Sequence, residues 1–288
     1  MTDKFQDVGI VKALYRYPVK SMRGEALAEA QVYWHGLEGD RRYAFMRGDV
    51  GDSSFPWLSG RQIPQMLLYA PQFTDPGNVR QSEIVVRTPH GRFLPITSPD
   101  LQAELAQAYS HDVRLIHIGR GIFDSLPLSV MSTATAEALN ADYRRFRQNI
   151  VIETAEGRPF IEESWLDRAL HFTSGARIRL NRRIERCVMV NVDPETAVKD
   201  PSILRLVAQT RDNCVGVHAS TEQPGMIRVG DVVTSQLPGT SEVPGSSSVT
   251  HPTLLRTIVQ TRDNCVGAHA STEQPGMIRV GDVVRVEA

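Results

Sequence analysis

The chain has 288 residues, a formal net charge of −1 at pH 7, 41% hydrophobic residues and 23% charged residues. This composition is typical of a globular protein with its own core, and it excludes a largely disordered or membrane-embedded chain. The balanced charge gives no general attraction to nucleic acid or to a membrane surface, and we expect neither as a partner.

The first hundred residues are predicted to form short strands broken by turns, with little helix. The predicted strands cover residues 8–17, 28–34, 42–46, 82–87 and 93–96. The first strand should stop at Pro18, and the last two flank His90-Gly91, a hairpin pattern. A helix is expected over 100–108, because Ser98-Pro99-Asp100 suits a helix N-terminus.

The second half mixes short helices with strands. Strands are predicted at 149–153, 176–180, 187–192 and, as a closing pair, within 226–233. Helices are predicted at 134–140, opened by Ser132-Thr133, and at 202–208. The three cysteines are Cys187, Cys214 and Cys265, with no Cys-x-x-Cys pair, so neither a disulfide framework nor a structural zinc site is indicated. The acidic N-terminal residues form no secretory signal, and a cytoplasmic location is expected.

A long internal repeat is the least usual feature of the chain. Residues 201–233 recur at 252–284, and 27 of the 33 aligned positions are identical. Residues 235–251 between the copies have the Ser/Gly/Pro-rich composition of a linker. A β-domain has one place for its closing strands, so one copy is redundant. We expect the first copy to fill that place, since it follows Cys187 closely. The surplus copy can pack elsewhere or swap into a second protomer as a dimer.

Seven segments between residues 8 and 234 carry a family resemblance, in order along the chain. They are 17–21 (Tyr-Pro-Val-Lys-Ser), 36–43 (Gly-Leu-Glu-Gly-Asp-Arg-Arg-Tyr), 58–62 (Leu-Ser-Gly-Arg-Gln), 145–152 (Arg-Phe-Arg-Gln-Asn-Ile-Val-Ile), 160–165 (Phe-Ile-Glu-Glu-Ser-Trp), 186–196 (from Arg-Cys to Glu-Thr) and 224–231 (Pro-Gly-Met-Ile-Arg-Val-Gly-Asp). Together they resemble the MOSC family with its N-terminal β-barrel domain, which includes the mitochondrial amidoxime-reducing components and their bacterial relatives.

The resemblance implies a mixed α/β, β-rich fold, with an N-terminal β-barrel-like domain followed by a MOSC β-barrel with short helices. The domains expected from it are 1–110 for the N-terminal MOSC β-barrel domain and 111–234 for the MOSC domain. The linker 235–251 and the repeat copy with its tail, 252–288, complete the chain.

The resemblance also implies a site for a molybdenum-molybdopterin cofactor, a Mo pyranopterin, where the two domains meet. Cys187 is then the metal ligand and the catalytic residue, because a thiolate suits a metal that already carries soft sulfur ligands. Arg and Lys side chains suit the cofactor phosphate. The expected cofactor contacts are Lys20, Ser21, Arg41, Arg147, Asn149, Arg186 and His218. Pyridoxal phosphate binding is a further label that the family carries.

The function that the resemblance implies is two-electron reduction of small N-hydroxylated compounds, with electrons supplied by a separate flavin or iron–sulfur reductase. Three other readings stay open. Cys187 could carry sulfur as a persulfide, the protein could bind the cofactor without turnover, or the duplication could mark a compromised variant. The chain departs from the amidoxime-reducing relatives at Glu185, where they have serine, and at His218 (repeated as His269), where they have tyrosine. Val215 stands where many relatives have phenylalanine.

Overall fold

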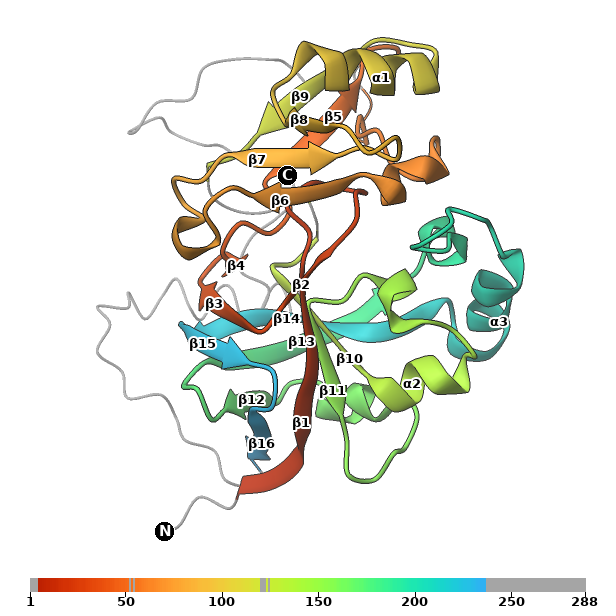
Figure 1. Ribbon diagram of the computed structural model, residues 1–288. Helices are drawn as coiled ribbons and strands as arrows, with labels where there is room; N and C mark the ends of the chain where they lie inside the picture. The colour runs from red at the N-terminus through yellow and green to blue at the C-terminus, as the bar shows by residue number, and fades with distance from the viewer. Residues whose placement is uncertain (1–4, 52, 54, 120–122, 124, 237–288) are drawn as a thin grey trace, which may run out of the picture. The chain divides into compact units, whose positions relative to one another are not determined.

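The computed structural model describes residues 5–51, 53, 55–119, 123 and 125–236. Strands dominate this part of the chain, and its three α-helices are short (Figure 1). The strands are β1 (Phe5–Arg16), β2 (Glu25–Leu27), β3 (Glu29–Tyr33), β4 (Gly36–Leu37), β5 (Tyr43–Arg47), β6 (Ala70–Phe73), β7 (Ile84–Arg87), β8 (Phe93–Pro95), β9 (Val113–His117), β10 (Leu128–Ser132), β11 (Ile150–Glu153), β12 (Ala169–Phe172), β13 (Arg177–Glu185), β14 (Cys214–Gln223), β15 (Gly225–Arg228) and β16 (Val232–Gln236).

The helical segments lie between these strands. The α-helices are α1 (Pro99–Tyr109), α2 (Thr133–Ala138) and α3 (Pro201–Arg211), and the 3-10 helices are η1 (Pro64–Leu68), η2 (Pro76–Asn78), η3 (Tyr143–Phe146), η4 (Ile161–Trp165) and η5 (Val188–Asn191). Within the described residues, no helix combines the length and the apolar character needed to cross a membrane. The second repeat copy, with Cys265 and His269, lies outside the described residues.

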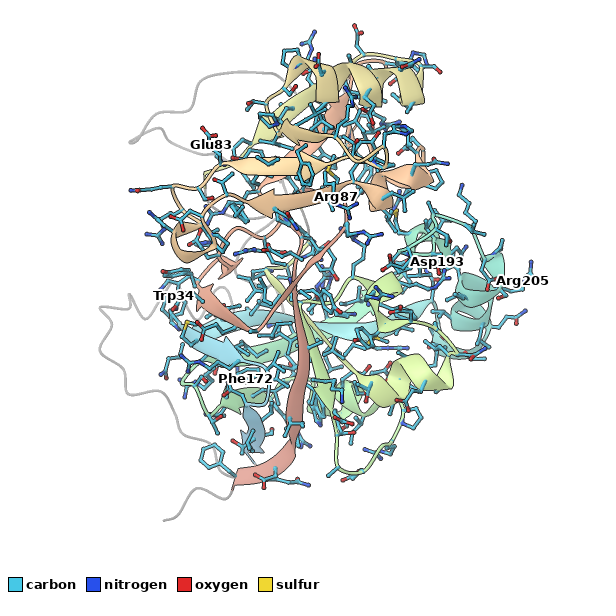
Figure 2. The ribbon with its side chains drawn as sticks, viewed as in Figure 1. Trp34, Glu83, Arg87, Phe172, Asp193 and Arg205 are labelled. Carbon is cyan, nitrogen blue, oxygen red and sulfur yellow. The ribbon has the colours of Figure 1, made fainter. Side chains whose placement is uncertain are left out.

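Seven strands close into a barrel in the order β11-β10-β14-β13-β12-β16-β1, with β1 pairing back onto β11. Strands β10 and β11 are parallel, whereas the other neighbours are antiparallel. The barrel interior is filled by apolar side chains from every strand of the ring, among them Leu14, Val130, Ile150, Phe172, Ile178, Val217 and Val233 (Phe172 is labelled in Figure 2). The β-rich mixed fold expected from the sequence is confirmed.

Strand β1 closes the ring between β11 and β16, although about 140 and 220 residues separate it from these partners. The ladder with β11 shifts register between Val11 and Ala13. Gly9 lies where the backbones approach most closely, since a Cβ at this position would stand 2.2 Å from the carbonyl oxygen of Glu153. A side chain at residue 9 would therefore push β1 away from β11.

The first repeat copy supplies α3, β14, β15 and the first two residues of β16, and both β14 and β16 belong to the closed ring. Strand β14 pairs with β10 and β13, and β16 pairs with β1 and β12. The prediction that the first copy closes the barrel is confirmed.

Residues between β1 and β10 build a second core around two small sheets, β5-β9 and β6-β7-β8, together with α1. Its buried side chains include Val19, Phe45, Met66, Ile84, Leu101 and Leu105. The predicted hairpin is confirmed, because β7 and β8 pair on either side of Gly91, whose φ is +80°. Strand β15 pairs with β3, which joins residues 225–228 to the first half of the chain.

The strand predicted over 187–192 is wrong, because residues 188–191 form the 3-10 helix η5. Strand β13 ends at Glu185, and the backbone N–H groups of Val190 and Val192 donate to the carbonyls of Cys187 and Met189. Val190 and Val192 are buried while Val188 is 47% exposed. The apolar run therefore packs beside α3 without joining a sheet ladder. Its β-branched composition favours a strand and does not predict this 3-10 helix.

Candidate functional site

A cavity of about 290 Å³ gathers seven of the eight side chains singled out by the sequence. The lining residues come from two parts of the chain, residues 20–61 and residues 125–218. The lining residues are Lys20, Ser21, Arg41, Phe55, Ser59, Arg61, Ser125, Leu126, Ser129, Arg145, Phe146, Arg147, Gln148, Ile184, Glu185, Arg186, Cys187, Met189, Val190 and His218. Asn149 is not among them and lies behind the wall.

Cys187 reaches the cavity from the turn between β13 and η5. The preceding residue is fixed on both sides, because the Arg186 N–H donates to the Asn213 carbonyl at 2.8 Å and the Asn213 side-chain amide donates to the Arg186 carbonyl at 2.7 Å. Cys187 is half-buried and forms no disulfide within the described residues. Its thiol is thus held on a defined backbone at the cavity wall, accessible to a ligand.

Arg186 presents its guanidinium to the cavity in a fixed orientation. Its Nε donates to the Val215 carbonyl at 2.8 Å, and its Nη1 donates to the Phe146 carbonyl at 2.9 Å. Two hydrogen bonds on different nitrogens define the plane of the guanidinium. A fixed cation next to Cys187 favours negative charge at this end of the cavity.

Arg41 and Arg147 approach the same aromatic ring, that of Tyr17, with their guanidinium carbons 4.7 and 4.3 Å from its centroid. Arg41 donates to the Arg147 carbonyl at 2.9 Å and forms a close ion pair with Asp40. Asn149 accepts from Ser129 Oγ at 3.0 Å and from Arg41 at 3.4 Å. Asn149 therefore positions the cationic wall from behind.

Tyr17 supports both arginines and remains a phenol at neutral pH. Burial raises the pKa of Tyr17 to about 12, although the neighbouring Arg147 and Arg41 guanidinium groups lower it. The hydroxyl donates to the Gln148 carbonyl at 3.2 Å. The aromatic face thus holds two cations beside the cavity by cation–π contacts.

Lys20 and Ser21 follow β1, and both line the cavity. The Lys20 ammonium donates to the Phe123 carbonyl at 2.6 Å and lies 5.7 Å from the Phe55 ring centroid. Ser21 is 6% exposed and has a φ of +67°, so the backbone turns sharply at this point. His218 enters from the opposite side, on β14, where it pairs in register with Ser129 of β10.

The cavity is strongly cationic. Six of its lining residues are Lys or Arg and one, Glu185, is a carboxylate. The positive charge of Arg145 is partly compensated, since its guanidinium donates to the Asp193 carboxylate at 2.7 Å. Such a surplus of fixed positive charge in a small recess attracts an anionic ligand. Arg61, Arg145 and Gln148 line the cavity but were missed as site residues by the sequence, although all three lie within the segments of family resemblance. Glu185, noted in the sequence only as a departure from the relatives, also lines the cavity.

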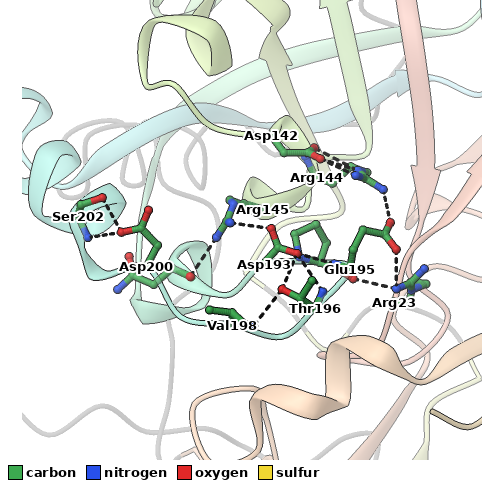
Figure 3. A network of polar contacts seen from close by, with 12 residues as sticks. Arg23, Asp142, Arg144, Arg145, Asp193, Glu195, Thr196, Val198, Asp200 and Ser202 are labelled. Carbon is green, nitrogen blue, oxygen red and sulfur yellow. Dashed lines mark hydrogen bonds and ion pairs between the residues drawn. The ribbon is translucent and has the colours of Figure 1, made fainter. Parts of the chain in front are cut away.

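A polar network holds the loop that follows Cys187 (Figure 3). Asp193 accepts hydrogen bonds from the backbone N–H groups of Glu195 and Thr196, each at 2.9 Å. The Glu195 carboxylate bridges Arg144 and Arg23, the second at 3.0 Å. Residues far apart in the sequence thereby fix the turn behind the cavity wall.

The donor set suits an anionic cofactor that brings its own metal ligands. Within the described residues, no group of three or more His, Cys, Asp or Glu side chains is arranged to hold a metal ion. Cys187 would supply one thiolate, and the surrounding arginines suit phosphate oxygens. The residues present therefore fit a pyranopterin with a bound metal.

The class of protein follows from these features together with its family models. Residues 8–116 match the MOSC N-terminal beta barrel domain and residues 124–234 match the MOSC domain. The chain is a MOSC-domain protein with an N-terminal MOSC β-barrel domain.

Curated relatives narrow the comparison further. Mitochondrial amidoxime-reducing component 1 of Xenopus laevis is 26% identical over 296 residues, covering 80% of this chain and 83% of that protein. The Homo sapiens protein of the same name is 26% identical over 293 residues, covering 79% and 83%. A crystal structure of the YUAD protein from Bacillus subtilis has a TM-score of 0.41 and 13% identity, covering 81% of this chain and 98% of the other.

Proposed function

We propose that the protein binds a molybdenum-molybdopterin cofactor in the cationic cavity, with the Cys187 thiolate as the metal ligand, and reduces N-hydroxylated compounds. The observation that carries the proposal is the meeting of one half-buried cysteine with six cationic side chains in a single cavity. The curated relatives named amidoxime-reducing components support the substrate class.

In this proposal each group of cavity residues has its own role. The bound cofactor would supply the two-electron redox chemistry. Arg41 and Arg147 would hold its phosphate, with Lys20 and Ser21 beside them, and Arg186 would stabilise the Cys187 thiolate. His218 lines the cavity from β14 and would donate one of the two protons that the reduction consumes, the other coming from solvent.

The partners in this proposal are a small N-hydroxylated substrate and a separate electron-donating reductase. The dimer formed by swapping of the duplicated tail stays a prediction, as does the family label of pyridoxal phosphate binding.

The first test is molybdenum content, measured by elemental analysis on the full chain produced in a host that makes the cofactor. We expect close to one molybdenum per wild-type chain and a loss of at least tenfold in Cys187→Ala, because the variant lacks the thiolate ligand. Cys214→Ala is the matched control. Cys214 is also a half-buried free cysteine but does not line the cavity, so this variant should keep its metal.

Activity follows in a second step, as reduction of benzamidoxime with reduced methyl viologen as the electron source. Molybdenum in the wild type and in Cys187→Ala alike would contradict the ligand assignment. A metal-free wild type that carries sulfane sulfur on Cys187 would favour the sulfur-carrier reading, whereas full cofactor content without turnover would favour a binding protein.

A further inference from the structure

Gln148 is a buried polar side chain that the fold itself leaves unsatisfied. Its exposed fraction is 1%, and it lines the cavity. Neither Nε2 nor Oε1 of its amide has a hydrogen-bond partner among the residues that the structure describes. A buried amide without partners destabilises a fold, so its presence at a cavity wall calls for a partner from outside the chain.

The amide lies at a point that only a glycine leaves open. Gly216 has a φ of +71°, a conformation that favours glycine. A Cβ at residue 216 would stand 2.4 Å from Gln148 Nε2 and 3.2 Å from Arg186 Nη2. Gly216 thus makes room for an amide and a guanidinium to meet at the inner wall.

The backbone that carries Gln148 is fixed before any ligand arrives. Its carbonyl accepts from the Tyr17 hydroxyl at 3.2 Å. The next residue, Asn149, donates its N–H to Ser129, with 3.1 Å to the carbonyl. The Arg186 guanidinium beside the amide is oriented by two carbonyls, as described above. A preorganised donor–acceptor group of this kind discriminates between ligands, because a molecule that cannot pair with it leaves the amide buried and unpaired.

We propose that Gln148 is a specificity-determining residue of the cavity, whose side-chain amide pairs with a neighbouring hydrogen-bond acceptor and donor on the bound molecule. An N-hydroxyamidine offers such a pair, and so does the lactam edge of a pterin. The inference rests on the proposed function, because the two sources of this chemistry are the substrate and the cofactor.

The test compares the full-length wild type with Gln148→Leu, which keeps the bulk of the side chain and removes both hydrogen-bonding atoms. Molybdenum and released pterin are measured per chain, and kcat and KM are measured with benzamidoxime and reduced methyl viologen. A fall of at least tenfold in pterin content assigns the amide to the cofactor. Unchanged content with KM raised at least tenfold and kcat within twofold assigns it to the substrate.

Thr88→Val is the matched control, because Thr88 is also fully buried, its hydroxyl has no partner among the described residues, and it lies outside the cavity. Melting curves report folding, and we expect Gln148→Leu to melt no lower than the wild type, since its amide makes no hydrogen bond within the described residues that the substitution would break. Gln148→Met, which keeps the length of the side chain, loses both hydrogen-bonding atoms and adds no charge, is the second variant should the leucine protein fail to fold.

Pterin content and KM within twofold of the wild type in these variants would overturn this inference alone. A wild type without molybdenum would instead overturn the proposed function, and this inference with it.

Discussion

Two buried polar side chains of this chain differ in what surrounds them. Glu162 is fully buried, yet Thr135 Oγ1 donates to its Oε2 at 2.9 Å, and that same hydroxyl accepts from the Phe160 N–H at 2.7 Å. Gln148 has no such partner among the described residues. The hydrogen bond to Oε2 makes Glu162 a structural group that ties η4 to α2, although its Oε1 has no partner among the described residues. Gln148 lacks a partner at both amide atoms and lines the cavity, which leaves it to a ligand.

Glu162 gives a prediction on the pH dependence of stability. Burial raises the pKa of Glu162, although hydrogen bonds, including that from Thr135, lower it in part. A carboxyl with a raised pKa in the folded state binds its proton more tightly there than in the unfolded chain. Its contribution to stability is therefore full below the unfolded pKa of about 4.3 and is lost as pH rises through the folded pKa.

Glu162→Gln has no carboxyl to ionise, so we expect it to keep the stability that the wild type loses when Glu162 deprotonates. The free energy of unfolding of Glu162→Gln relative to the wild type should therefore increase as pH rises from 4 upward. Urea unfolding at a series of pH values measures the difference, with the exposed Glu156→Gln as the control. Wild-type and Glu162→Gln curves that run parallel across the series would show that the carboxyl titrates normally.

At the scale of elements, the sequence predicted those helices and turns that local signals, such as capping residues and a turn glycine, specify. Ser98 caps α1 by accepting from the Asp100 N–H, and Asp200 caps α3 by accepting from the Ser202 N–H. The hairpin at Gly91 likewise depends on one turn. Residues 187–192 were misread as a strand because their β-branched composition is shared by strands and by this short buried 3-10 turn, and only neighbouring elements decide between them.

The turn after η5 gives a prediction at this scale. Partial burial alone would raise the pKa of Asp193, but hydrogen bonds from the Glu195 and Thr196 N–H groups and the Arg145 guanidinium lower it overall. Asp193→Ala should lower the free energy of unfolding by about 0.5–1.5 kcal/mol, because it removes hydrogen bonds at exposed donors that water can only partly replace.

The deficit of Asp193→Ala should shrink as pH falls, because a carboxyl with a lowered pKa stabilises the fold above its unfolded pKa of about 3.9 and loses that effect as pH falls through the folded pKa. Urea unfolding at pH 7 and in stepwise acid provides the measurement, with the exposed Glu156→Ala as the comparison. A deficit that is the same at every pH would contradict the role given to the ionised carboxylate.

At the scale of the whole molecule, contacts between distant segments limited what the sequence could predict. No local pattern places β1 between β11 and β16, since register across such separations is set by the closed barrel. The cavity was anticipated through the family resemblance, and seven of the eight residues it indicated line the wall. Gln148 was missed because its place in the cavity depends on Arg186 and Gly216, which lie beside it only in the folded chain.

The duplicated segment gives the last prediction. Deleting residues 201–251 joins Asp200 to Pro252. The second copy then follows Asp200 directly, as the first copy does in the full chain. Two of the substitutions it brings keep apolar positions apolar, namely Ile203 to Leu254 and Val207 to Ile258, and both original residues are buried. Another of the six differences between the copies, Val217 to Ala268, shortens a fully buried core side chain.

We expect the deletion variant to fold, with a stability lower by about 2 kcal/mol because of the smaller side chain, which corresponds to roughly 4–8 °C in melting temperature. The reference is the chain shortened to residues 1–240, and the matched control is Val217→Ala within it. Melting curves by circular dichroism should place the deletion variant close to this control. Light scattering compares the full chain with the deletion variant, and we expect a dimer in the full chain alone, because only the full chain has a surplus copy to insert into a second protomer. A deletion variant that fails to melt cooperatively, beside a control that does, would mean that the second copy, with Arg285-Val286-Glu287 in place of Thr234-Ser235-Gln236, cannot close the barrel.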